Sequence, residues 1–441
     1  MASRKAWRLL HVTPHLGGGV GRALLSLAEG DVLWPQAAPR RTVVCLEPPE
    51  KTGVVPRLRE LGVDVLTLST PEALPSIASD HDVVQCETWN HPRVFAALAS
   101  LRDTPLRMLF WCHVSGLHFP RLPPALWRQP HPVVLTAPCS LSSHEDGLKD
   151  GVARGQVHVI SSAAGFERWP TPQARPASGP ARLGYLGSLN LAKMHPRYAE
   201  WLAAAARPGC SVALLGDEVQ PGWWSERCAQ LGRPGLMQAQ GYCQDVAQAL
   251  SQWDAMLYLL NPFHYGTAEI ALLEAMASGV VPVVGANPCE SDVVTHGETG
   301  WVAHDPAELG EILARCDDDV PLRQRMATNA SDWVRETFTL QRQATAFQRL
   351  HEALLDGPRQ SVDWPALLGE RPWQWFASTV PEPDAFVPGR APVLPQGDAV
   401  HAHLENTKGS VHHFARCFPN DDTLQAWSQA VRATRHEACT P

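Results

Sequence analysis

The stretch Tyr265–Gly285, YGTAEIALLEAMASGVVPVVG, places a carboxylate inside an apolar pattern. Small and apolar side chains recur there at helical spacing, and the run VVPVVG that follows is typical of a buried strand. Glu274 lies within this helix, Gly266 precedes it, and Thr267 is its expected N-cap. The amides at a helix start bind anions such as a diphosphate. We therefore predict an anion site at Gly266, Thr267 and Ala268.

The same pattern also fits a purely structural helix that packs on a sheet, with Glu274 solvated or salt-bridged. Glu269 lies five residues before Glu274, which corresponds to about 140° around a helix, so the two carboxylates do not share a face. Glu269 either contacts a ligand or only stabilises the first turn through the helix dipole. The residue pattern leaves both alternatives open.

Two loops that follow predicted strands could approach a phosphate. Gly184–Lys193, GYLGSLNLAK, brings the cation Lys193, whose structural alternative is plain solvation. Gly17–Arg22, GGGVGR, contains Gly18 and Gly19, and glycines let the backbone approach a ligand closely. A tight turn between strand and helix explains the same glycines, and the dinucleotide fingerprint G-x-G-x-x-G is absent.

His113 ends the apolar strand RMLFWC, at the strand end where open parallel sheets bind ligands. A single His is more often structural, and this chain has 19. Near the C-terminus, Lys408 and His412–His413 are expected on a solvated surface. His11 and His15 do not share a helix face, and no Cys/His cluster has zinc spacing. We therefore predict no metal site and no cofactor.

The elements around these residues alternate between apolar strands and helical patterns, which is typical of parallel sheets covered on both faces. The predicted strands are 7–13, 42–46, 63–68, 82–87, 107–113, 133–137, 157–161, 182–186, 211–215, 255–260, 281–284 and 300–303. Helical patterns cover 20–29, 92–101, 198–205, 268–278, 306–316, 321–337 and 340–355.

The alternation stops once, in the Pro-rich stretch 168–181, and then restarts. The prediction is an α/β fold with two Rossmann-like doubly wound domains facing a cleft, 1–167 and 182–355, joined by the linker 168–181. A Pro-rich extension with a C-terminal helical segment occupies 356–441. Ligands of such sheets bind at the carboxyl ends of the strands, so the cleft is the expected site.

Composition excludes several classes of protein. At 441 residues, with 44% hydrophobic and 19% charged residues, the chain fits a globular protein of more than one domain. The net charge of −8 argues against a nucleic-acid partner. No segment is apolar for the roughly 18 residues that span a bilayer. Eleven scattered Cys, several in apolar runs, indicate buried thiols in a reducing compartment, so we expect a cytoplasmic protein.

The run LLEAMASGVVPVV, Leu272–Val284, resembles the donor-domain signature of GT-B glycosyltransferases, in particular glycosyltransferase family 4, also called group 1. The resemblance implies that the first domain binds the acceptor and the second binds a nucleotide-sugar donor. It also implies that Glu274 binds the ribose and Lys193 the diphosphate, and that His113 forms a hydrogen bond to the reacting sugar. This sequence departs from the family signature at two positions. Gly266 stands where the family has its first Glu, and Ser188 stands where it has an Arg that neutralises the diphosphate. Glu269 is the candidate replacement for that first Glu.

The implied activity is retaining transfer of a sugar from a nucleotide-sugar donor to an acceptor hydroxyl, in polysaccharide or glycolipid synthesis. The candidate catalytic residues are His113, Lys193 and Glu269, and the acceptor is a carbohydrate or a lipid-linked sugar. Exposed Trp side chains such as Trp223–Trp224 would allow peripheral membrane contact. The alternatives are a nucleotide-sugar epimerase or sugar phosphorylase of the same fold, and a non-catalytic protein that binds nucleotide sugars.

Overall fold

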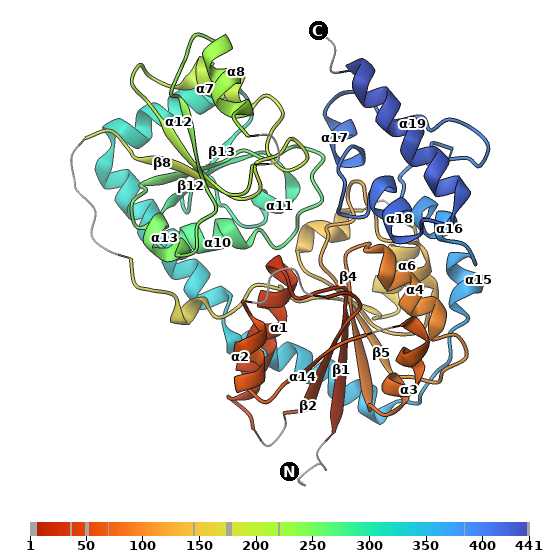
Figure 1. The fold of residues 1–441 in the computed structure, drawn as a ribbon. Coiled ribbons are helices and arrows are strands. Elements are labelled where there is room, and N and C mark those ends of the chain that lie inside the picture. Colours follow the sequence, from red (N-terminus) through yellow and green to blue (C-terminus); the bar gives the residue numbers. More distant parts are fainter. Residues whose placement is uncertain are drawn as a thin grey trace. The chain divides into compact units, whose positions relative to one another are not determined.

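The computed structural model describes residues 7–35, 38–48, 53–68, 70–143, 146–172, 179–218, 221–382 and 384–438. The chain divides into two compact units (Figure 1). Unit 1 comprises Met1–Ala164, Tyr265–Ala268 and Leu340–Pro441, and unit 2 comprises Gly165–His264 and Glu269–Thr339. Part of the predicted linker, 173–178, lies outside the described residues.

Unit 1 contains a seven-stranded sheet in the order β3-β2-β1-β4-β5-β6-β7, with every neighbouring pair parallel. Its central strands β1, β4 and β5 are buried along almost their whole length, as expected for a sheet covered on both faces. The strands are β1 (Arg8–Thr13), β2 (Arg40–Cys45), β3 (Asp64–Thr67), β4 (Val83–Thr88), β5 (Met108–Cys112), β6 (Val133–Leu135) and β7 (Val157–Val159).

The connections between these strands are mostly helical. They are α1 (Gly18–Asp31), α2 (Val55–Glu60), α3 (Leu74–Ser79), α4 (Pro92–Ser100), α5 (Ala125–Arg128) and α6 (Asp146–Ala153). Position 21 on α1 requires a glycine, because a Cβ there would lie 2.1 Å from the Leu16 carbonyl oxygen. The chain therefore turns tightly from β1 into α1.

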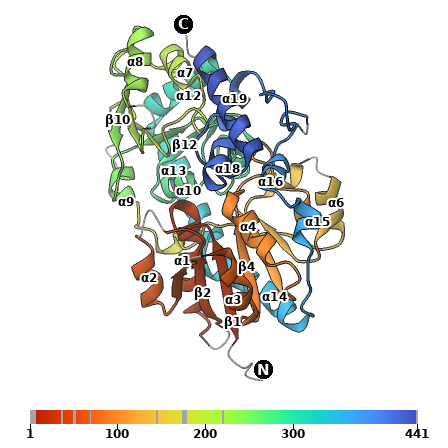
Figure 2. The same cartoon turned by 45° about the vertical axis from the view of Figure 1, so that its right-hand side comes forward.

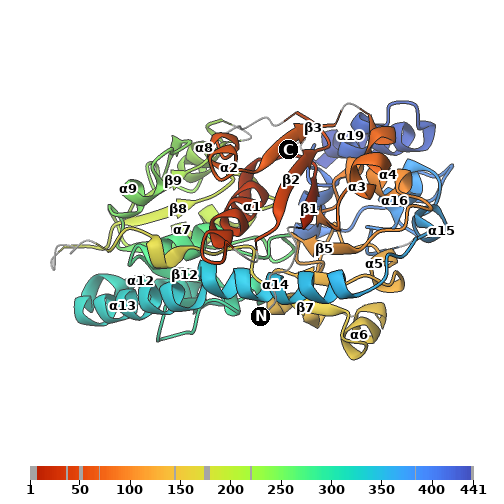
Figure 3. The same cartoon turned by 90° about the horizontal axis from the view of Figure 1, so that it is seen from below.

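The last hundred residues of the chain complete unit 1. The helix α14 (Leu340–Asp356) lies beside α1 (Figure 3). It also packs against β4, and its Phe347 ring lies 4.6 Å from the buried Trp111 ring of β5. The helices α16 and α18 then pack on α4, and α19 packs on α18 (Figure 2). The remaining bounds are α15 (Trp364–Leu368), α16 (Pro372–Ala377), α17 (Val400–His403), α18 (Val411–Cys417) and α19 (Asp422–Ala438).

Unit 2 contains a six-stranded parallel sheet in the order β10-β9-β8-β11-β12-β13. Its strands are β8 (Leu183–Leu186), β9 (Val212–Leu215), β10 (Met237–Gly241), β11 (Ala255–Tyr258), β12 (Val281–Gly285) and β13 (Trp301–Ala303). Its helices are α7 (Tyr198–Ala205), α8 (Trp223–Gln230), α9 (Val246–Leu250), α10 (Ile270–Ala277), α11 (Pro288–Ser291), α12 (Pro306–Asp318) and α13 (Val320–Thr337). The predicted fold class of two doubly wound parallel sheets and a C-terminal helical region is confirmed.

Several sequence expectations differ from the structure. The polar edge strand β10 has no apolar signal and was not predicted. The helix at 340–355, grouped with the second domain from sequence, lies in unit 1. His412 and His413 are buried rather than solvated, because α18 packs on α4. Trp224 is also buried, at 2% exposure, so it is not the exposed side chain that the sequence predicted. Within the described residues, no helix combines the length and the apolarity needed to cross a bilayer.

Candidate active site

Each sheet has a point where the strand order reverses beside its first strand. In unit 1, β1 lies between β2 and β4, and in unit 2, β8 lies between β9 and β11. Open parallel sheets bind ligands outside the carboxyl ends of the strands at such a switch point. Candidate functional side chains are therefore expected at these two edges, each within its own unit.

At the unit 1 edge, a buried carboxylate holds two histidines. Glu87 on β4 is fully buried, and its Oε2 lies 2.8 Å from His113 Nε2 and its Oε1 3.0 Å from His11 Nδ1. Burial alone would raise the pKa of Glu87, but the hydrogen bonds from His11 and His113 outweigh it and hold that pKa below its usual range. Glu87 is therefore an ionised acceptor. His113 directly follows β5, where the sequence predicted it.

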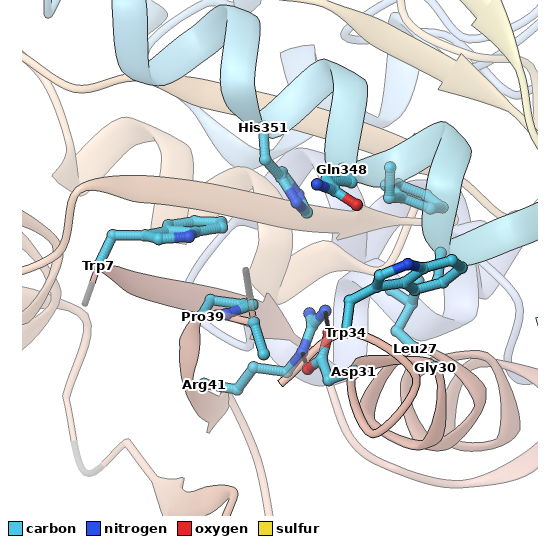
Figure 4. A pocket seen from close by; sticks show the side chains of 12 residues that line it. Trp7, Leu27, Gly30, Asp31, Trp34, Pro39, Arg41, Gln348 and His351 are labelled. Carbon is cyan, nitrogen blue, oxygen red and sulfur yellow. Dashed lines mark hydrogen bonds and ion pairs between the residues drawn. The ribbon is translucent and has the colours of Figure 1, made fainter. Parts of the chain in front are cut away.

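The tautomer of His11 follows from its second neighbour. Arg41 Nη1 lies 2.7 Å from His11 Nε2, and a guanidinium can only donate. Nε2 therefore accepts, and Nδ1 carries the proton donated to Glu87. Burial lowers the pKa of His11, which keeps the ring neutral. Arg41 also binds Asp31 through two nitrogens, and both side chains line a cavity of about 30 Å³ (Figure 4).

The glycine loop lies on the same edge of unit 1. Gly18 and Gly19 are the first residues of α1 and are exposed, and Gly18 has a φ of +63°. The N-cap of α1, Gly17, provides no side-chain cap, and its amide donates to His15 Nδ1 at 3.0 Å. The first amides of this 14-residue helix are thus suited to an anion. The predicted roles of Gly18 and Gly19 remain predictions.

The segment Tyr265–Ala268 belongs to unit 1 although its neighbours in sequence belong to unit 2. The Tyr265 carbonyl accepts from the Ser115 amide at 3.1 Å, and the hydroxyls of Thr267 and Thr136 lie 3.0 Å apart. Ser115 comes two residues after His113. The structure therefore brings Gly266, Thr267 and Ala268 to the strand that positions His113.

At the unit 2 edge, a second buried carboxylate binds a cation. Lys193 Nζ lies 2.8 Å and 3.2 Å from the two Glu269 oxygens, and the Tyr258 hydroxyl donates to Glu269 at 2.7 Å. The ammonium also lies 5.5 Å from the centre of the Tyr258 ring. Burial raises the pKa of Glu269 but the charges of Lys193 and His264 outweigh it, so the pKa is lowered. The two predicted residues Lys193 and Glu269 form one cluster.

The helix that carries the sequence motif begins later than predicted. α10 starts at Ile270, and its N-cap is Glu269 rather than Thr267. Glu269 has a φ of +40° and a ψ of +49°, the left-handed region that costs a side-chain-bearing residue about 1–2 kcal/mol. It therefore precedes the helix, so the angle of about 140° predicted between it and Glu274 does not apply. The left-handed turn is what aims the Glu269 carboxylate at Lys193 and Tyr258.

Glu274 lies in the middle of α10 and is 4% exposed, among five apolar buried residues. Beside this helix, the buried His264 lies 3.1 Å from a Glu290 oxygen through Nε2, and its Nδ1 lies 3.9 Å from Glu269. Arg197, which follows Lys193 by four residues, is exposed and precedes α7. Unit 2 thus gathers two carboxylates, Glu269 and Glu290, with Lys193 and His264 in one cluster.

Glu87 and Tyr258 were not predicted from the sequence, and His11 was considered there only as a metal ligand and excluded. A signal was present, because Glu87 is a carboxylate at the end of the apolar strand VVQCE and Tyr258 ends a buried strand. Among the described residues, no group of three or more His, Cys, Asp or Glu side chains is placed to hold a metal ion. A cavity of about 930 Å³ in unit 2 lies at the amino ends of β8 and β9, away from Lys193 and Glu269.

Comparison with known proteins agrees with this architecture. Residues 170–333 match the family model of Glycosyl transferases group 1. A glycogen synthase of Mycobacterium tuberculosis is 27% identical over 301 residues, covering 63% of this chain and 70% of the relative. The structure of Anabaena HepE in complex with UDP-glucose matches with a TM-score of 0.62 at 15% identity, covering 79% of this chain and 99% of that one. A glycosyltransferase from Rickettsia africae has a TM-score of 0.63 at 11% identity, covering 80% and 100%.

The fold is therefore GT-B, with two Rossmann-like domains. Residues 170–333, which carry Lys193, Glu269 and Glu274, match the group 1 glycosyltransferase model, and the protein is a glycosyltransferase.

Proposed function

We propose that the chain is a retaining transferase that moves a sugar from a nucleotide-sugar donor to an acceptor hydroxyl in polysaccharide synthesis. The observation that carries this proposal is the Lys193–Glu269–Tyr258 cluster at the switch point of the group 1 domain. It combines a cation with the start of a helix, which suits a diphosphate.

In this proposal each residue has a defined role. Lys193 neutralises the diphosphate leaving group, and the amides at the start of α10 add donors for it. Glu269 fixes the Lys193 ammonium and contacts the sugar. Glu274 binds the ribose hydroxyls, because a carboxylate accepts two hydrogen bonds from a diol. His113 forms a hydrogen bond to the transferred sugar, and Gly18 and Gly19 provide backbone amides.

The relatives suggest the first substrates to test. The HepE structures contain UDP or UDP-glucose, and the curated relative is named a glycogen synthase. We therefore propose a glucosyl nucleotide as donor and an α-glucan as acceptor.

Thermal stabilisation by nucleoside diphosphates tests the donor site. We expect one of UDP, ADP, GDP or dTDP to raise Tm, since a ligand of the folded state stabilises it by mass action. Glu274→Gln should abolish this shift for the preferred nucleotide while the apo Tm stays close to wild type. No shift with any of the four would contradict the donor assignment.

Incubation with the matching glucosyl nucleotide then tests the reaction. With glycogen added, we expect an α-linked product, whose anomeric configuration NMR reports. An isomer of the nucleotide sugar formed without acceptor would indicate the epimerase instead. A Tm shift without any turnover would indicate the non-catalytic binding protein.

A further inference from the structure

Three donors surround the Glu87 carboxylate in unit 1, and each comes from a regular element or directly follows one. His11 Nδ1 on β1 and Gln85 Nε2 on β4 both lie 3.0 Å from Oε1, and His113 Nε2 lies 2.8 Å from Oε2. Glu87 is 0% exposed and His113 is 6% exposed at the side chain. An ionised carboxylate only accepts, so each of these three nitrogens must carry a hydrogen.

We propose that Glu87 is the positioning residue of His113, and that it holds His113 as the Nε2–H tautomer with Nδ1 as the acceptor for a substrate hydroxyl. The proposal rests on the proposed function for the assignment of His113 to the sugar. The tautomer itself is a property of unit 1 alone. A buried carboxylate that fixes the tautomer and orientation of a functional imidazole is a recurrent device in enzyme sites.

The two donors to Glu87 Oε1, His11 and Gln85, are themselves held in place by their other hydrogen-bond partners. Arg41 can only donate to His11 Nε2, so His11 must present its proton to Glu87. Two bonds from Arg41 to Asp31 hold that guanidinium beside the small cavity at the end of α1 (Figure 4). The Gln85 amide is oriented in the same way, because its Oε1 lies 3.1 Å from His351 Nε2 and its Nε2 faces Glu87.

These fixed donors make the effect of one substitution specific. Glu87→Gln leaves a single acceptor oxygen among three donors. The oxygen is expected to face His11 and Gln85, since Arg41 prevents His11 from inverting. The new amide NH₂ then faces His113 Nε2, which must become an acceptor, and the proton moves to Nδ1. The variant therefore converts His113 to the Nδ1–H tautomer, and Nδ1 can no longer accept a hydrogen bond from a substrate hydroxyl.

The tautomer can be measured without any substrate. In the full chain labelled with ¹⁵N-histidine, the His113 signals are the ones missing from a His113→Gln variant. We expect Nε2 protonated and Nδ1 unprotonated in the wild type, and the reverse in Glu87→Gln. The matched control is Glu47→Gln, which neutralises a different His-bound carboxylate of unit 1, 3.2 Å from His91 Nε2. It should leave the His113 signals unchanged.

An Nδ1–H tautomer of His113 in the wild type would overturn the proposal, and so would an unchanged tautomer in Glu87→Gln. If Glu87→Gln does not fold, the wild-type spectrum still decides. With UDP-glucose as the probe, kcat per folded molecule should fall about 10- to 100-fold in Glu87→Gln, with KM near the wild-type value, and stay unchanged in Glu47→Gln. A wild-type kcat in Glu87→Gln contradicts the proposal. Absence of turnover in the wild type contradicts only the proposed function, because the tautomer test is independent of activity.

Discussion

Glu87 in unit 1 and Glu269 in unit 2 are both buried carboxylates at the switch point of a parallel sheet, but their partners differ. Glu87 accepts hydrogen bonds from two imidazoles and an amide, all on or directly after strands. Glu269 binds an ammonium from a loop and occupies a left-handed backbone conformation. The first cluster has regular secondary structure around it, whereas the second depends on two irregular segments.

This difference indicates different tasks. A carboxylate held by strand residues can fix the orientation of one ring, which suits the positioning of His113. A carboxylate that binds a partly exposed Lys can share that cation with an arriving phosphate, since Lys193 keeps 14% of its side chain exposed. We therefore expect the Glu87 cluster of unit 1 to orient the His113 ring and the Glu269 cluster of unit 2 to supply the Lys193 charge. Substitutions in each cluster test these two roles separately.

The largest effect is expected from Lys193→Ala. Loss of the cation should lower turnover of UDP-glucose about 100-fold or more, because the Lys193 ammonium is the group proposed to neutralise the diphosphate. Loss of one partner of a buried ion pair should also reduce the free energy of unfolding by about 3 kcal/mol in urea titrations. Lys149→Ala, at an exposed Lys of α6, is the control and should change neither quantity. Near-wild-type turnover in Lys193→Ala would contradict the proposal that Lys193 neutralises the diphosphate.

A double-mutant cycle compares the two clusters directly. For Lys193→Met and Glu269→Gln we expect a coupling energy of about 2 kcal/mol, because the neutral double variant leaves no unpaired charge. Salt should weaken this coupling, since Lys193 is partly exposed. The cycle of His11→Gln and Glu87→Gln should be insensitive to salt, because both side chains are at most 1% exposed. Equal salt dependence in the two cycles would contradict the comparison.

Acidification should weaken unit 1 before unit 2. The folded pKa of His11 is lowered by burial, so its contribution is present above the unfolded value near 6.5 and is lost as pH falls below it. The folded pKa of Glu269 is also lowered, but its contribution is lost only as pH falls below about 4.5. Between pH 6.5 and 5, His11→Gln should therefore reduce the slope of the unfolding free energy by at most about 1.4 kcal/mol per pH unit. The Lys193→Met, Glu269→Gln double variant should leave that slope unchanged in urea titrations.

The smallest effect is expected from Thr267→Val. Loss of the hydroxyl contact with Thr136 should cost about 1 kcal/mol of unfolding free energy. Because Thr267 packs within unit 1, hydrogen exchange should increase around Thr136 and Ser115, and not around Lys193. Increased exchange at Lys193 instead would place the segment in unit 2.

The sequence predicts the elements better than their ends. Every predicted strand is present among the described residues, because most strands of the two parallel sheets contain apolar runs, whereas the polar edge strand β10 lacks that signal. The start of α10 was predicted at Thr267 from N-cap propensity. A Glu at a left-handed N-cap is disfavoured locally, and the structure holds it there through Lys193 and Tyr258.

The candidate site was predicted in part for a similar reason. Lys193, Glu269 and His113 could be proposed because they follow strands or a recognisable motif. Glu87 could not be connected with His113, since the two are 26 residues apart and meet only when β4 and β5 pair in register. The same holds for Arg41 and His11, which come together through the pairing of β1 with β2.

The route of the chain has a consequence for dissecting the protein. Because the sequence passes from one unit to the other at residues 164–165, 264–265, 268–269 and 339–340, no single cut separates two complete halves. A fragment ending at Ala164 would lack α14 and leave Trp111 without the Phe347 ring that covers it. A self-standing N-terminal half would need residues 340–441 joined to it through a new linker. Shorter truncations should therefore yield insoluble material rather than an isolated unit 1.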